Sequence, residues 1–141
     1  MNVLFVGRAN LGRSQMAQAF FDHLSEFTST STDTMVADFE GQTAAERGQV
    51  APSVVMVLEL MNEEGLDISS EQRNQLTPEL VGAAYKAIVM AQRDSWPDYL
   101  MEGGKVVFWE ISDPVNIPRN PAQSIMDQIK GLVEDLVRET G

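Results

Sequence analysis

The sequence contains no cysteine and only one histidine, His23. A chain without cysteine forms no disulfide and offers neither a thiolate nucleophile nor a thiolate ligand for a metal ion. A single imidazole also excludes a site built from several histidines. Thiol redox chemistry, Cys–His catalysis and Cys-rich zinc sites are therefore outside the chemistry that this chain can perform, and we expect no metal or other cofactor.

Positive charge is also scarce. The chain carries 10 Lys and Arg against 21 acidic residues, for a formal net charge of −11. Such a surface repels the phosphates of nucleic acids and anionic membranes, so we expect neither as a partner. No apolar run approaches the ~20 residues that span a bilayer, and no basic segment precedes the first apolar run. We expect one cytoplasmic domain over residues 1–141.

Strand-like and helix-like apolar patterns alternate along the chain. Short apolar or β-branched runs predict strands at 2–6, 28–34, 87–90 and 106–109, with the last two as inner strands. Apolar residues at helical spacing predict helices over 14–27, 52–64, 78–84 and 120–136. Gly65 is expected to end the second helix in a left-handed conformation, and Thr77 to cap the third. The alternation predicts an α/β fold of three layers, with a central four-stranded parallel sheet between helices on both faces.

The segment between the first strand and the first helix carries the candidate chemistry. A loop there lies at the positive end of a helix dipole, and backbone N–H groups turned inward make a concavity for an anion. Arg13 would add a planar fork of donors that matches two oxygens of a phosphate. The alternative is a solvent-exposed arginine at a helix start. We therefore predict a phosphate-binding loop, made of Gly7, Arg8, Ala9, Asn10, Leu11, Gly12, Arg13 and Ser14.

The same residues resemble a known family. The stretch VLFVGRANLGRSQMAQAF at 3–20 is similar to the signature of low-molecular-weight protein tyrosine phosphatases and the related arsenate reductases, in which a cysteine begins the loop. Further matches follow in the family's order: GLDIS at 65–69, QLT at 75–77, IVM at 88–90 and SDP at 112–114. The resemblance covers nearly the whole chain and implies the same three-layer fold.

The resemblance also implies roles for single residues. Gly7 stands at the position of the nucleophilic cysteine, Arg13 at that of the phosphate-holding arginine, and Asp113 at that of the general acid that protonates the leaving group. Asn10 matches the residue that props the loop, and Ser14 matches the hydroxyl that stabilises the thiolate. Ser31 begins a stretch, Ser-Thr-Asp-Thr, where the family has Ser-Ala-Gly-Thr.

The departure at Gly7 decides the expected function. Without a thiol, neither a cysteinyl-phosphate intermediate nor thiol-based arsenate reduction is available. We expect a phosphatase-like protein that binds phosphate or a similar oxyanion without thiol catalysis, with a phosphorylated protein or a second copy in a homodimer as further partners. A resident anion ~4 Å from a bound one repels it by about 1 to 4 kcal/mol. Gly7 should therefore make phosphate binding tighter than in a Gly7→Cys variant.

Two other functions stay open. One is phosphatase or arsenate reductase activity, as in the family, retained in residual form. The other is nucleotide binding, because Gly7-x-x-x-x-Gly12-Arg13-Ser14 differs by one residue from the loop G-x-x-x-x-G-K-[ST], with Glu110 as the only candidate acidic ligand for magnesium at a strand end. Phosphate binding without magnesium would separate the anion site from such a nucleotide site. His23 is interpreted as a packing residue, and Trp96 and Trp109 as core or rim.

Overall fold

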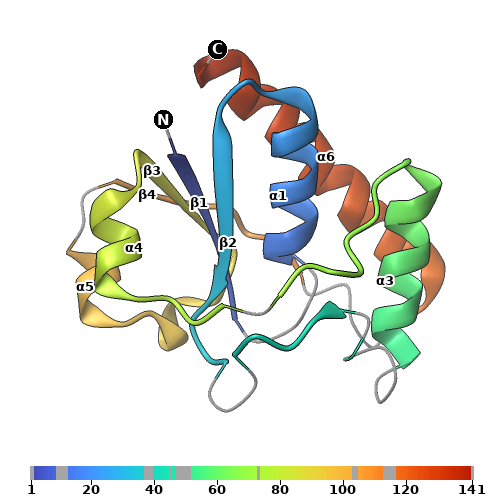
Figure 1. Ribbon diagram of the computed structural model, residues 1–141, viewed down its shortest axis with the longest axis horizontal. Coiled ribbons are helices and arrows are strands. Elements are labelled where there is room, and N and C mark those ends of the chain that lie inside the picture. The colour runs from blue at the N-terminus through green and yellow to red at the C-terminus, as the bar shows by residue number, and fades with distance from the viewer. Residues whose placement is uncertain are drawn as a thin grey trace.

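The computed structural model describes residues 2–8, 13–36, 40–44, 46, 52–72, 74–102, 105–112 and 117–140. Its centre is a parallel sheet of four strands in the order β2-β1-β3-β4 (Figure 1). The strands are β1 at Asn2–Gly7, β2 at Thr28–Asp33, β3 at Lys86–Val89 and β4 at Val106–Phe108. The predicted four-stranded parallel sheet is confirmed.

Helices cover both faces of this sheet. They are α1 at Arg13–Leu24, α3 at Pro52–Glu63, α4 at Pro78–Ala83, α5 at Asp98–Met101 and α6 at Arg119–Thr140. Figure 1 shows α1, α3 and α6 on one side of the sheet and α4 and α5 on the other. The predicted three-layer α/β fold is therefore confirmed. None of the helices in the described part of the chain is both long and apolar enough to cross a membrane.

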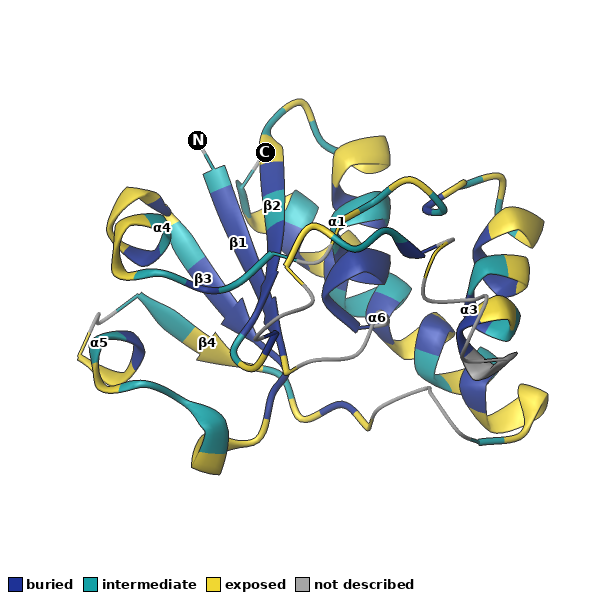
Figure 2. Ribbon diagram, turned by 60° about the horizontal axis from the view of Figure 1, so that its bottom comes forward, coloured by how far each residue is buried: buried dark blue, intermediate teal, exposed yellow. Residues whose placement is uncertain are grey.

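β1 joins the two halves of the core, because its successive side chains point to opposite faces. Val3 and Phe5 pack with α1, α3 and α6, whereas Leu4 and Val6 pack with α4 and α5. All four side chains are fully buried, and Figure 2 shows the strand in dark blue. A strand buried on both faces reads as the continuous apolar run that the sequence shows at this point.

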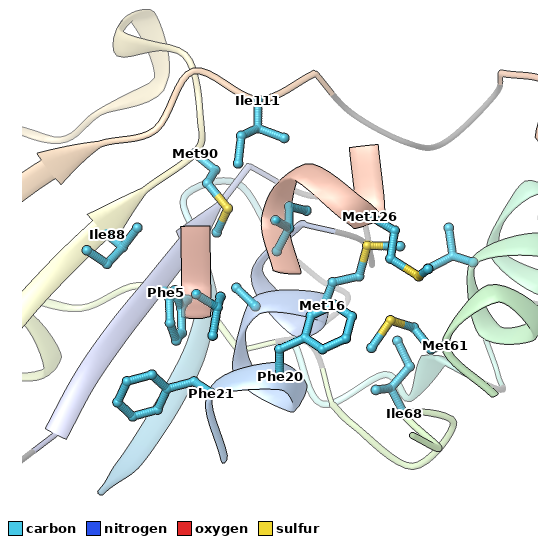
Figure 3. Packing of buried hydrophobic residues seen from close by; sticks show 14 of the residues in the cluster. Phe5, Met16, Phe20, Phe21, Met61, Ile68, Ile88, Met90, Ile111 and Met126 are labelled. Atoms are coloured by element: carbon cyan, nitrogen blue, oxygen red, sulfur yellow. The ribbon is translucent and has the colours of Figure 1, made fainter. Parts of the chain in front are cut away.

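The larger half of the core is rich in aromatic and methionine side chains (Figure 3). Phe5 lies between Phe21 of α1 and Trp109, with ring centroids 5.8 Å and 6.1 Å away. Met126 on α6 and Met16 on α1 fill the space between the two helices. This packing holds the first turn of α1 against the sheet beside the end of β1, where the predicted loop begins.

Three details of the predicted fold are wrong. β4 is an edge strand rather than an inner one, and Val107 and Phe108 are each more than a third exposed. His23 lies in the last turn of α1 and is exposed instead of packed. α1 ends at Leu24 rather than at residue 27, and the side chain of Leu24 is exposed.

The end of α3 follows the predicted pattern. Gly65 has a φ of 81°, and its N–H donates to Asn62 O at 2.9 Å. The N–H of Leu66 donates to Met61 O at 3.0 Å, which completes the two bonds of a Schellman motif. A Cβ added to Gly65 would meet no atom within 4 Å. A side chain at this position would therefore cost only the backbone strain of the left-handed conformation.

Gly65→Ala should therefore lower the free energy of unfolding by about 1 kcal/mol, as expected for an L-residue forced into the left-handed region. Urea denaturation measures it. The matched control is Gly131→Ala in the interior of α6, where a Cβ also meets nothing within 4 Å. That variant should gain about 0.5 to 1 kcal/mol from helix propensity. Equal effects of the two changes would contradict the assignment of strain to Gly65.

Candidate functional site

The strand order places a switch point between β1 and β3. The chain runs from β1 to β2 on one side and from β3 to β4 on the other. Ligands of open α/β sheets bind at such a point, outside the carboxyl ends of the strands. Gly7 at the end of β1 pairs with Asp33 at the end of β2, while Val6 pairs with Val89 at the end of β3. Arg13 and Ser14 open α1 at the same edge.

Arg13 is buried, with only 4% of its surface exposed. Its Nη1 donates to Met90 O at 2.7 Å and to Ile111 O at 2.9 Å. The interpretation of Arg13 as a solvent-exposed residue is therefore wrong. These two carbonyls use both hydrogens of Nη1. The two carbonyls fix the plane of the guanidinium and tie α1 to the ends of β3 and β4.

Asp33 brings a carboxylate to the position where the nucleophile was expected. Asp33 is buried, with only 2% of the residue exposed. A Cβ added to Gly7 would lie 2.5 Å from Asp33 Oδ1, which is closer than such atoms approach, and 3.3 Å from Ser14 Oγ. The hydroxyl of Ser14 donates to the same Oδ1 at 3.3 Å. Gly7, Ser14 and Asp33 therefore form one contact cluster.

The backbone around Asp33 is held from both sides. Its N–H donates to Asn74 O, and its carbonyl accepts from Leu76 N, each at 2.9 Å. The N–H of Thr34 donates to Gly7 O at 3.0 Å, which extends the pairing of β1 and β2 past their last residues. The carboxylate is thus carried on a fixed strand end rather than on a free loop.

This carboxylate changes the electrostatics that the sequence suggested. We expected Gly7 to leave the site without the negative charge of a thiolate. The structure places the acidic side chain of Asp33 beside that position. Tighter phosphate binding than in a Gly7→Cys variant therefore no longer follows from charge alone.

The other predicted site residues are only partly placed. Ala9, Asn10, Leu11, Gly12 and Asp113 lie outside the described residues. Arg8 is exposed, its carbonyl accepting from Met35 N at 2.7 Å. Sequence analysis missed Asp33 as a member of the site. The one signal was an aspartate in a Ser- and Thr-rich strand, at a position where the resembling family has glycine.

A hollow of about 170 Å³ lies at the ends of β3 and β4, next to the carbonyls that hold Arg13. It is lined by Met90, Gln92, Phe108, Glu110, Ile111 and Ser112. Within the described part of the chain, no three His, Asp or Glu side chains gather closely enough to hold a metal ion.

Comparison with known proteins gives a likeness of fold. No family model matches the chain, and none of the curated proteins does. Among solved structures, the low-molecular-weight protein tyrosine phosphatase from T. tengcongensis is 23% identical, with 99% of both chains covered and a TM-score of 0.78. An arsenate reductase in its phosphate-binding state is 20% identical, with 99% of this chain and 98% of that one covered and a TM-score of 0.77. A Cys-to-Ser mutant of the YwlE arginine phosphatase, with a phosphorylated active site serine, is 18% identical, covers 99% and 95%, and has a TM-score of 0.78.

These neighbours share the fold over the whole length of this chain. At 18 to 23% identity they establish the architecture and nothing about activity. The fold that this chain shares with them does not favour the alternative of a nucleotide-binding P-loop protein.

Proposed function

We propose that this protein binds phosphate or a similar oxyanion at the carboxyl end of β1, on the fold of the low-molecular-weight phosphatases, without thiol chemistry. The observation that carries the proposal is Arg13, a buried arginine at the first position of α1 whose guanidinium is held in place by two backbone carbonyls. A fixed guanidinium beside a helix N-terminus is a strong partner for an oxyanion.

The solved neighbours support the same choice of ligand. The arsenate reductase is in a phosphate-binding state, and the YwlE mutant carries a phosphate on a serine that replaces its cysteine. In that mutant an oxygen accepts the phosphoryl group in place of sulfur. An oxyanion site is therefore compatible with this fold whether or not a thiol is present.

The absence of cysteine limits the chemistry of the site. A cysteinyl-phosphate intermediate and a thiol redox cycle both need a sulfur that the chain does not contain. The proposal is thus a phosphatase-like protein that has lost the family's thiol step. A general acid at Asp113 would be idle unless another group attacks phosphorus.

Titration with inorganic phosphate in the absence of magnesium tests the proposal. We expect saturable shifts of the backbone amide NMR signals of residues 8–14, with a dissociation constant of about 1 mM or lower, which corresponds to roughly −4 kcal/mol. Sodium chloride of equal ionic strength controls for screening. Arg13→Lys, which loses the fork, should weaken binding about tenfold, whereas the exposed Arg138→Lys on α6 should not. Absence of saturable shifts would overturn the proposal.

A further inference from the structure

We propose that Asp33 takes the place of the missing nucleophile, so that its carboxylate meets the phosphorus of a bound phosphate ester and accepts the phosphoryl group. The inference rests on the proposed oxyanion site and adds to it the residue that would attack. It also gives that site a reaction class, hydrolysis of phosphomonoesters through an aspartyl phosphate.

The side chain of Asp33 lies where the side chain of a nucleophile at residue 7 would lie. An ideal Cβ on Gly7 would lie 2.5 Å from Asp33 Oδ1, so the side chain of any nucleophile at residue 7 would start in contact with this oxygen. The two residues are partners in the register of β1 and β2. The absent side chain at one strand end and the carboxylate at the next therefore fill the same space.

The hydroxyl of Ser14 is a hydrogen-bond partner of Asp33. Ser14 Oγ lies 3.3 Å from the Cβ position on Gly7 and donates to Asp33 Oδ1 at 3.3 Å. A hydroxyl in this place would support an anion on residue 7, and in this protein it donates to the side chain of residue 33. An acidic oxygen thus lies at the floor of the site, in place of sulfur.

The backbone of Asp33 is held in place by hydrogen bonds. A covalent nucleophile has to be held close to its productive geometry by a rigid backbone. The backbone N–H and carbonyl of Asp33 are both hydrogen-bonded, to Asn74 and Leu76. A carboxylate is also an established nucleophile toward phosphorus in proteins. Its place beside Gly7, its hydrogen bond from Ser14 and its fixed backbone together distinguish Asp33 from the many exposed carboxylates of this acidic chain.

The reaction balances without any redox partner. In the first step a lone pair of Asp33 Oδ1 forms a bond to phosphorus and the bond from phosphorus to the ester oxygen breaks. That oxygen takes one proton from solvent and leaves as an alcohol. In the second step water attacks phosphorus and the bond to Oδ1 breaks. The products are inorganic phosphate, one released proton and the original carboxylate.

Beryllofluoride, which binds carboxylate oxygens as a phosphoryl analogue, tests this role directly. We expect the unmodified protein to give a bound ¹⁹F NMR signal, and Asp33→Asn to lose it. The same variant should bind inorganic phosphate about tenfold more tightly or better, because one negative charge has been removed from the site. Retained phosphate binding also shows that the variant is folded. Asp127→Asn, an exposed carboxylate on α6, is the matched control and should keep the ¹⁹F signal.

Each outcome decides between the proposals. Phosphate binding without a beryllofluoride signal, or a signal that survives in Asp33→Asn, would overturn the nucleophile and leave the oxyanion site standing. No binding of either anion to either protein would overturn both. Should Asp33→Asn fail to fold, ¹³C-labelled aspartate in the unmodified protein locates the adduct. A shifted carboxyl signal from any residue other than Asp33 would then contradict the inference.

Discussion

Gly7→Cys alone should give a less stable protein with no thiol-dependent phosphatase activity, although it restores the residue that the related family uses. The new Cβ would lie 2.5 Å from Asp33 Oδ1, so the carboxylate has to move. It is buried and accepts a hydrogen bond from Ser14, which makes that movement costly. Overpacking of this kind lowers the free energy of unfolding by about 1 to 3 kcal/mol.

Combining Gly7→Cys with Asp33→Gly should restore the lost stability and give the protein thiol-dependent phosphatase activity. The second change removes the atom that the Cβ meets and leaves the hydroxyl of Ser14 for the thiolate. Removal of a nucleophile costs a hydrolase up to about 10⁶-fold in rate, so even an imperfectly placed thiolate should raise hydrolysis of an aryl phosphate by at least about 100-fold over Gly7→Cys alone. The two changes are therefore strongly non-additive.

Denaturant unfolding and aryl phosphate hydrolysis measure both effects in the original chain, the two single variants Gly7→Cys and Asp33→Gly, and the double variant. Gly7→Ala with Asp33→Gly is the matched control, because it carries the Cβ without the sulfur and should be stable but inactive. The φ of Gly7 lies outside the left-handed region, so backbone strain does not confuse the comparison. A single Gly7→Cys variant as stable as the original chain would contradict the clash.

The elements of this fold could be predicted because their signals are local. β1 and β3 are short apolar runs, and α3 ends at a glycine that the chain needs in a left-handed conformation. The polar β2 had the weakest signal of the four strands, a run rich in Ser and Thr. The edge position of β4 could not be predicted, since strand order depends on pairings between distant segments.

The candidate site shows the same division. The sequence placed Arg13 and Ser14 at the end of a loop between a strand and a helix, and in the structure they are the first two residues of that helix. That Asp33 fills the space beside Gly7 depends on the register of two strands, and no pattern within either strand encodes it. The acceptors of Arg13 were equally hidden, because Met90 and Ile111 lie 77 and 98 residues further along the chain.

Arg13→Met should lower the free energy of unfolding by about 3 to 5 kcal/mol. Methionine keeps much of the length of the side chain but cannot donate to Met90 O or Ile111 O, the acceptors of two buried hydrogen bonds from a charged group. Each such bond contributes about 1.5 to 3 kcal/mol, and the carbonyls left behind are buried without this donor. Out of a typical total of 5 to 15 kcal/mol, the loss is large.

Guanidinium denaturation of Arg13→Met and Arg8→Met separates this structural role from a general effect of charge. Both variants lose one positive charge at the same edge of the sheet, but Arg8 is exposed and its change should alter stability by less than about 0.5 kcal/mol. A loss below about 1 kcal/mol in Arg13→Met would contradict the structural role. If the expected loss is found, the guanidinium that we propose for the anion also serves the fold, because its Nη1 bonds hold α1 against the segments that follow β3 and β4.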